Sequence, residues 1–343
     1  MANELAAGYA SLAGIGLESL AGDWATLVAP TIKIPFVNEN LNQLIDYLEN
    51  NALEGERGYE SPTIIGYKTS GPLRVQASYR SSEFLIYAAL GGDSAITGAS
   101  APYTHTLDIG DNILRSMSII IEKDVTCWEI AGARINTMTL VSSPTEGVYW
   151  DIELIAKKVT RSTTHRAALA ALTYNENNPR LFHHQLAFRL ADCADALATG
   201  DIIGPSDISL AINNKLIPDD VTSKSGLYIE EPRRGGKTEI LLNFTLPRYE
   251  ADTLLDFRDN GTKLQADLIY TGGTCGGGNY SQTINLTTLY IKEITAPVSD
   301  ETKVPLSVAC QCYRNDGNTN MSETEELEVL LDNGNDAVLA WTA

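Results

Sequence analysis

The stretch EPRRGGKTEILLNFTL, residues 231–246, decides between two kinds of fold. Its Gly-Lys-Thr triplet at 236–238 ends the motif Gly-x-x-x-x-Gly-Lys-Ser/Thr, whose backbone N–H groups wrap phosphates at the start of a helix. That motif requires glycine at position 231, where the chain has Glu231, and a carboxylate there would repel phosphate. From Thr238 to Leu246 the side chains alternate with a period near two, as in a half-buried strand. We therefore predict a turn followed by a β-strand.

Strand-like alternation dominates the chain. In VYWDIELIAKKV (148–159), the side chains of Val148, Trp150, Ile152 and Leu154 share one face. Further strands are predicted at 114–121, 135–141, 208–212, 264–270, 281–286, 289–294 and 305–313. Two short helices stand out: SSEFLIYAALGG (81–92), begun by Ser81 or Ser82 and stopped by Gly91, and RYEADTLLDFRDNG (248–261), ended by Asn260-Gly261.

A repeat indicates that the chain is duplicated. SPTEGVYWDIEL (143–154) and EPRRGGKTEILL (231–242) both place Pro-x-x-Gly between two strands, where glycine would supply a positive φ. A strand leading into a helix also occurs twice, in 72–90 and 240–257. We predict a mainly β protein with two tandem domains, 1–165 and 166–343, each a β-barrel or sandwich with a short flanking helix, joined within 162–180.

Composition limits the function. Among 343 residues, 43% are hydrophobic, and 25 Lys+Arg against 44 Asp+Glu give a net charge of −19. Such a surface disfavours tight binding of nucleic acid, although nucleic acid can pass close to it. Five scattered cysteines fit reduced thiols. The N-terminus lacks a basic region and Glu18 and Asp23 interrupt its apolar run, so we expect neither a signal peptide nor a membrane span.

No residue set predicts catalysis or metal binding. His183 and His184 adjoin in a predicted strand, which would point their side chains to opposite faces, and His105 and His165 lack metal-ligand spacing. Cys310 and Cys312 share one face of a predicted strand without a second pair of ligands, so core cysteines are expected.

Three loop segments lack the residues of a ligand site. Asp316-x-Asn-x-Asn320 has the step of a calcium loop, but Met321 takes the place of its glycine and Leu327 that of its glutamate. Residues 272–280 (GGTCGGGNY) predict a hairpin tip, and the acidic stretch 322–336 a solvated face or flexible tail. We predict no catalytic, cofactor-binding or metal-binding residues, no cofactor and no enzymatic activity.

The order of several segments resembles the major tail tube proteins of long, non-contractile-tailed (siphovirus-type) phages. The resemblance extends from about Gly8 to Tyr313 and is carried by the Tyr-x-His strand at 103–105, the Ser-x-x-Ile strand at 118–121 and the Gly-x-x-x-Asn strand at 132–136. It implies sheets that line a hollow tube, and rings that stack through a long loop. Our candidate for this loop is 35–61, which is polar and lacks clear strand alternation, although Leu41, Leu44, Ile45 and Leu48 would also suit a short helix. The duplicated length favours trimeric rings with pseudo-sixfold symmetry over hexamers.

The same resemblance implies a structural protein of the virion tail, assembled in the host cytoplasm, whose lumen conducts DNA during genome ejection. Its implied partners are copies of itself, a tape-measure protein, tail terminator and tail-tip proteins and, transiently, double-stranded DNA. We further predict that the inward-facing residues are enriched in Asp and Glu, because an acidic lumen would let DNA slide.

Three alternatives stay open. A two-domain β-sandwich binding module, such as a virion decoration or carbohydrate-binding adhesin, would need exposed aromatics; the chain has four Trp, and Trp150 falls on an apolar face. A hydrolase assembled from scattered carboxylates has no supporting spacing. The inner tube of a contractile tail uses similar domains to those of a non-contractile one.

Overall fold

The structure is a computed structural model that describes residues 11–18, 24–50, 61–92, 96–110, 114–173, 179–218, 221–223, 225–298, 303–321 and 323–334. It is mainly β, as predicted, and the strands pair antiparallel throughout the described ranges. We divide the strands by chain order into two groups, the N-terminal unit (β1 to β10) and the C-terminal unit (β11 to β18). β6 belongs to the first group by sequence alone, because its strand partner is β18.

The elements of the N-terminal unit are β1 Leu12–Leu17, β2 Ile32–Ile34, β3 Phe36–Glu39, β4 Asn42–Leu48, β5 Thr63–Gln76, α1 Ser82–Leu90, β6 Tyr103–Asp108, β7 Met117–Glu122, β8 Cys127–Ser143, β9 Gly147–Ala156 and β10 Lys158–Ser162; α2, Arg166–Ala171, follows. Those of the C-terminal unit are the 3₁₀ turn η2 His183–Gln185, β11 Leu186–Asp192, the 3₁₀ turn η3 Thr199–Asp201, β12 Ile202–Ile203, β13 Asp207–Asn213, β14 Glu239–Leu246, α3 Thr253–Asn260, β15 Leu264–Cys275, β16 Gly278–Thr295, β17 Leu306–Tyr313 and β18 Leu327–Asn333.

The two units have the same order of strand pairing. In the N-terminal unit one layer runs β2-β1-β7-β8-β10 and a second runs β4-β5-β9-β8, with β3 also on β5. In the C-terminal unit the layers run β12-β11-β15-β16-β18 and β13-β14-β17-β16. The long strands β8 and β16 each belong to both layers of their unit, so the layers meet along one continuous strand.

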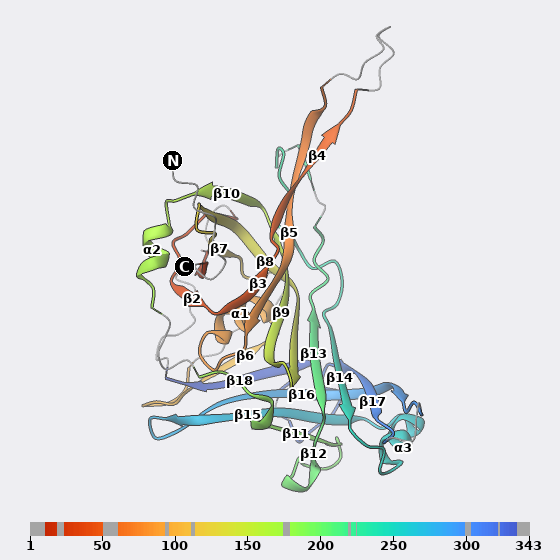
Figure 1. Ribbon diagram of the computed structural model, residues 1–343. Coiled ribbons are helices and arrows are strands. Elements are labelled where there is room, and N and C mark those ends of the chain that lie inside the picture. Colours follow the sequence, from red (N-terminus) through yellow and green to blue (C-terminus); the bar gives the residue numbers. More distant parts are fainter. Residues whose placement is uncertain are drawn as a thin grey trace.

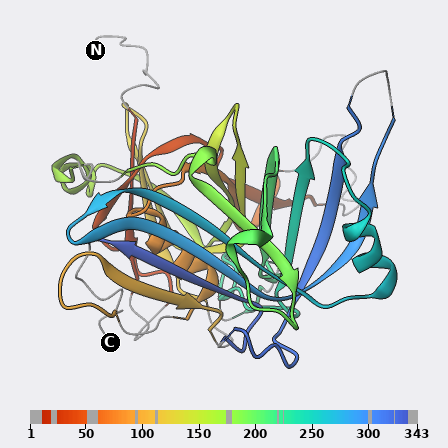
Figure 2. The same cartoon turned by 90° about the horizontal axis from the view of Figure 1, so that it is seen from below.

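Two strand pairings hold the units together. β13 pairs with the C-terminal half of β8, with Leu210 opposite Leu140, and β6 pairs with β18, with His105 opposite Leu331. The second layers of both units thereby form one sheet, β4-β5-β9-β8-β13-β14-β17-β16 (Figure 1). A single cluster of buried apolar side chains runs through both units. Seen from below, α2 and α3 lie at opposite edges of the molecule (Figure 2).

The predicted helices are present at both places. α1 ends at Gly91, which has a left-handed φ of 86°, and α3 ends at Gly261, with a φ of 62°. Because α1 is packed between layers, it is buried almost all round: eight of its residues are buried, including Glu83.

The segment 35–61 is not the irregular loop that its sequence indicated. Residues 36–39 and 42–48 form β3 and β4, which pair with β5 in a long hairpin that projects from the body as an arm (Figure 1). Residues 51–60 lie outside the described residues. The alternation was missed because both faces of the arm are open: Leu44 and Ile45 are adjacent, and 57% and 41% exposed.

The two Pro-x-x-Gly segments are not equivalent turns, contrary to the prediction. Gly147, with a φ of +97°, closes the tight hairpin between β8 and β9. Gly235 has no positive φ and lies on the return leg of a long connection between β13 and β14, where its N–H donates to the Lys215 carbonyl at 2.8 Å. The half-buried Arg234 guanidinium holds this leg against the body by donating to the carbonyls of Gly110 at 3.0 Å and Leu90 at 3.3 Å.

Two other predicted segments have a different structure. His183 and His184 lie in the turn η2 and not in a strand, because the Phe182 N–H donates to the Gln185 side chain at 3.0 Å and so closes the turn. The acidic C-terminal stretch is no free tail at 327–333: it forms β18 between β16 and β6, since Leu327, Val329 and Leu331 alternate toward the core.

Candidate functional site: a polar sheet face

The shared sheet of the two units has one apolar and one polar face. On β13, Ile208, Leu210 and Ile212 are 1–2% exposed and pack in the core, so the intervening residues at 207, 209, 211 and 213 point to the other side. Paired residues of antiparallel strands lie on the same face. The strand registers therefore show which side chains form rows across the sheet.

One row runs through Arg74, Asp151, Thr139, Ala211, Leu241, Gln311 and Tyr290, and the next through Gln76, Tyr149, Val141, Ser209, Asn243, Ala309 and Glu293. Flanking positions are Asn38, Pro72, Glu153, Thr137, Asn213, Glu239, Asp207, Thr245, Ser307 and Thr295. We call these residues together the polar sheet face. Small and uncharged polar side chains predominate in it.

The charges of this face are mainly negative. It carries five carboxylates, on Asp151, Glu153, Asp207, Glu239 and Glu293, against the single guanidinium of Arg74. That guanidinium is bound by Asp151, to which its Nε and Nη2 donate at 2.5 and 2.7 Å. The hydrogen bonds to Asp151 raise the pKa of Arg74, so its guanidinium stays charged. The face thus presents an excess of acid.

The face is gently hollowed but has no enclosed pocket. A depression of about 350 Å³ crosses β8, β13, β14, β17 and β16, and Ser209, Asn243, Thr245 and Ser307 are among its lining residues. Small-molecule sites are normally concave and mainly apolar. A wide and open depression is suited to contact with a large surface.

Apolar packing on the opposite side of the sheet holds the polar face in place. Trp150, 1% exposed, lies in the core as its alternation predicted, and its Nε1–H donates to Ser82 Oγ of α1 at 3.2 Å. Phe188 and Phe244 meet edge to face at 5.1 Å in the C-terminal unit. Each unit therefore supports its part of the polar face with large buried side chains.

The cysteines and histidines singled out from the sequence do not lie on the polar face. Cys310 and Cys312 are buried on the core side of β17, as expected, and burial raises the pKa of Cys310 to about 12. His105 is buried, and its Nε2 lies 3.8 Å from Glu83 Oε2. His183 bonds Ser142 Oγ at 2.9 Å and the Pro205 carbonyl at 3.2 Å.

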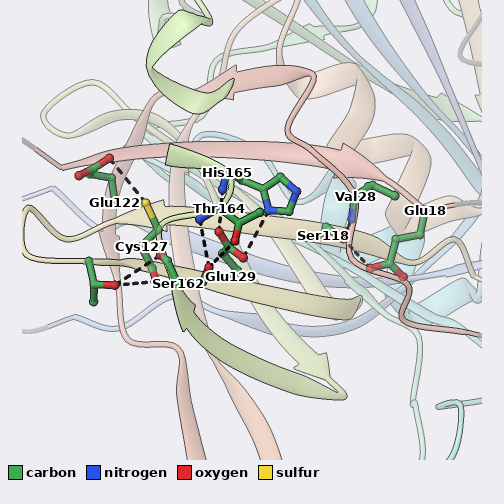
Figure 3. Close-up of polar contacts among 10 residues, drawn as sticks. Glu18, Val28, Ser118, Glu122, Cys127, Glu129, Ser162, Thr164 and His165 are labelled. Atoms are coloured by element: carbon green, nitrogen blue, oxygen red, sulfur yellow. Dashed lines mark hydrogen bonds and ion pairs between the residues drawn. The ribbon is translucent and has the colours of Figure 1, made fainter. Parts of the chain in front are cut away.

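A separate group of polar side chains lies between β1, β7, β8 and β10 (Figure 3). It contains a thiol and an imidazole, the residue types of a nucleophile and its base. Burial raises the pKa of the Cys127 thiol to about 11, which is the reverse of an activated thiolate, and Cys127 donates to Glu122 at 3.6 Å. The backbone N–H of His165 donates to Glu129 Oε1 at 2.9 Å, so this carboxylate fixes the start of α2.

Glu18 in the same view has a structural role (Figure 3). Its Oε1 accepts from Ser118 Oγ at 2.7 Å and from the Gly132 N–H at 2.8 Å, tying the end of β1 to β7 and β8. Among the described ranges, no three metal-ligating side chains converge on a common point. Nor does any helix there have the length and hydropathy to cross a membrane.

A broad polar sheet face over a continuous core, without an enclosed pocket, is typical of a structural β protein. The sequence matches the family described as phage tail tube protein over residues 8–312, and the chain belongs to that family. Proteins of this family are structural components of a tail tube. A search of curated proteins found no match.

Sequence reasoning predicted the individual strands but not the polar face as a unit. The signal for the half of the polar sheet face that the C-terminal unit supplies was present in DISLAIN (207–213), whose polar residues alternate with apolar ones. The pairing of β13 with β8, which joins the rows of the two units, has no signal in either strand alone.

Proposed function

We propose that this chain is the repeating subunit of a phage tail tube, and that the polar sheet face lines the lumen through which double-stranded DNA passes. The observation that carries the proposal is the single sheet that crosses both units with one polar face. In this proposal the units are two domains, 1–165 and 166–343, and three chains close a ring of pseudo-sixfold symmetry.

The dimensions of such a ring suit DNA. Each unit supplies four strands to the shared sheet, so three chains give about twenty-four strands. With strands ~4.8 Å apart, the circumference is ~115 Å and the diameter between backbones ~37 Å. Side chains reduce this opening, but the small residues of the polar sheet face leave room for a duplex.

The charge of the face supports passage without retention. Neutralisation of phosphates by Lys and Arg is what makes proteins hold DNA. The only cation among the five carboxylates of the face is Arg74, and it is already bound to Asp151. A DNA duplex inside the ring would meet a surface whose excess of carboxylates repels its phosphates.

The arm formed by β4 and β5 is the proposed contact between stacked rings. Leu44, Tyr47 and Leu48 are 57%, 53% and 59% exposed on it, a concentration of apolar side chains with no cover in the described part of the chain. Tyr67 stacks on Tyr228 at 5.2 Å, so the β13–β14 connection supports its base. A neighbouring ring that covered these side chains would gain apolar burial.

Electron microscopy of the purified full-length chain over a concentration series tests the proposal. We expect hollow rings or tubes with a regular axial repeat, and threefold averaging that resolves six similar units. A chain that stays monomeric even with the tail-tip initiator and tape-measure protein added would refute the tube and favour a binding module.

A matched variant tests the role of the arm. Tyr47→Ser and Leu48→Ser together should leave rings but shorten or abolish tubes, because both residues lie beyond the part of the chain that ring closure uses. Val125→Ser, at a residue 73% exposed in the turn between β7 and β8, is the control. Tubes of normal length from the double variant would exclude the arm from stacking.

A further inference from the structure

We propose that adjacent subunits are joined by a copy of the strand pairing that joins the two units within one chain. In this junction residues 41–44 of one subunit pair with residues 293–296, at the end of β16, of the next. The inference rests on the proposed ring and adds the strands and register that close it.

The first half of the argument is that 38–44 corresponds to β13. Glu39 pairs with Leu73 of β5, which pairs with Ile152 of β9. In the same way Ile208 pairs with Phe244 of β14, which pairs with Val308 of β17.

The correspondence continues along both segments without a gap. Three residues further on, Asn42 and Ala211 are again paired with equivalent positions, Ser70 and Leu241. Each segment has one buried leucine at its centre, Leu41 at 2% and Leu210 at 1% exposure.

The second half is that the end of β16 corresponds to the part of β8 that receives β13. Both strands carry a one-residue bulge where they pass from one layer to the other, between Ile135 and Thr137 in β8 and between Ile291 and Glu293 in β16. Aligning the bulges makes Thr137 equivalent to Glu293, and places Ile294 at the position of Met138.

The register of the new junction follows. Within the chain, Asn213 faces Thr137, Ile212 faces Met138 and Ala211 faces Thr139. When the same register is applied to the junction between subunits, Leu44, Gln43 and Asn42 of one subunit face the next subunit. Their partners there are Glu293, Ile294 and Thr295, in that order. The rows of the polar sheet face would then continue from one chain to the next.

Both edges are open in the single chain. In the described residues, β3 and β4 pair only with β5, and 290–295 of β16 pairs only with β17. Glu293 and Thr295 are exposed, and Val298, just beyond, is 78% exposed. Unpaired edges of this kind invite a further strand. β8, the equivalent of β16, already has that strand in β13.

A second copy of the chain is the occupant that fits. The donor edge at β3–β4 and the acceptor edge at β16 stand at opposite ends of one sheet, so pairing is head to tail. If the rotation that relates the two units is one sixth of a turn and also relates successive chains, the ring closes after three chains. A pairing by any other protein would leave one donor and one acceptor edge open.

Disulfide trapping tests the register in the full-length chain. In a Cys193→Ser background, which removes the half-buried thiol, Asn42→Cys and Thr295→Cys should form bonds between subunits, since paired strand residues lie within disulfide range. We expect covalent dimers and trimers and nothing larger. Ala211→Cys with Thr139→Cys, the equivalent pair inside the chain, is the positive control and should close within one chain.

Two comparisons keep the result specific. Asn40→Cys with Thr295→Cys shifts the register by two residues, and we expect at least tenfold slower trapping. Each sample is also viewed by electron microscopy. Rings that form without trapping of the Asn42 and Thr295 pair overturn this junction but leave the tube intact, whereas the absence of rings, with initiator present, refutes the proposed function itself.

Discussion

Reversing the charge of the polar sheet face should convert the proposed DNA-conducting surface into one that binds DNA. Glu153, Asp207 and Glu293 are suitable because they are exposed and no ion pair is shown for them. Replacing all three by lysine changes the face from −4 to +2 per chain, since each reversal adds two charges. In a ring of three chains the change is from −12 to +6, with nine lysines around the duplex.

The size of the effect follows from counterion release. If about six lysines reach phosphates, the logarithm of the binding constant falls with a slope of about −5 against the logarithm of salt concentration, or roughly three orders of magnitude between about 50 and 200 mM. The assay is DNA retention by assembled tubes in a salt series, together with ejection from particles that carry the variant. We expect retention at low salt, its loss at high salt, and slowed ejection.

A neutral variant separates charge from shape. Glu153→Gln, Asp207→Asn and Glu293→Gln keep nearly the same side-chain volume and leave the face at −1, so we expect no retention. Equal ejection by the lysine and amide variants, with no salt-dependent binding by either, would show that these residues do not face the DNA and would refute the assignment of the lumen.

Three further outcomes follow from the core and the buried groups. Trp150→Ala should lower the free energy of unfolding by about 3–5 kcal/mol, measured by urea denaturation, whereas Tyr149→Ala on the polar face should cost far less; equal losses would contradict the assigned faces. A thiol reagent at about pH 8 should label only Cys193 in the folded chain, and slowly, because burial raises its pKa to about 11; fast labelling of several thiols would show an open core. Burial raises the pKa of Glu328 above its ordinary 4.5, so stability should fall as pH rises through the interval above that value, and Glu328→Gln should flatten this dependence; an unchanged pH profile would exclude a protonation difference at this residue.

Sequence periodicity predicted several of the half-buried strands, but not β18, which alternates as well and was predicted to be a solvated face or flexible tail. β9 and β14 alternate because one face of each packs in the core, and Trp150 and Phe244 fell on the predicted side. The arm gave no such signal because water reaches both faces of β4, so nothing selects alternate apolar residues. Where an element has no buried face, periodicity cannot reveal it.

Long-range contacts explain the other differences. Pro232 to Gly235 has the composition of a turn, but its conformation is set by Arg234, whose guanidinium reaches carbonyls more than a hundred residues away in sequence. The polar sheet face depends likewise on the pairing of β13 with β8, two strands whose sequences do not identify each other as partners. The candidate site was therefore visible in the sequence as separate polar positions and not as a surface.

The fusion of two units into one chain has an evolutionary consequence. In a ring built from identical single units, every mutation at a junction is repeated at all junctions, so all neighbouring units bind each other with the same free energy. In the proposed ring of three chains, half of the junctions would be internal to a chain, and the pair of Leu210 and Leu140 could diverge from its counterpart between chains. Selection can therefore keep the inner junctions permanently closed while it tunes the outer ones for reversible assembly and correction of misplaced subunits.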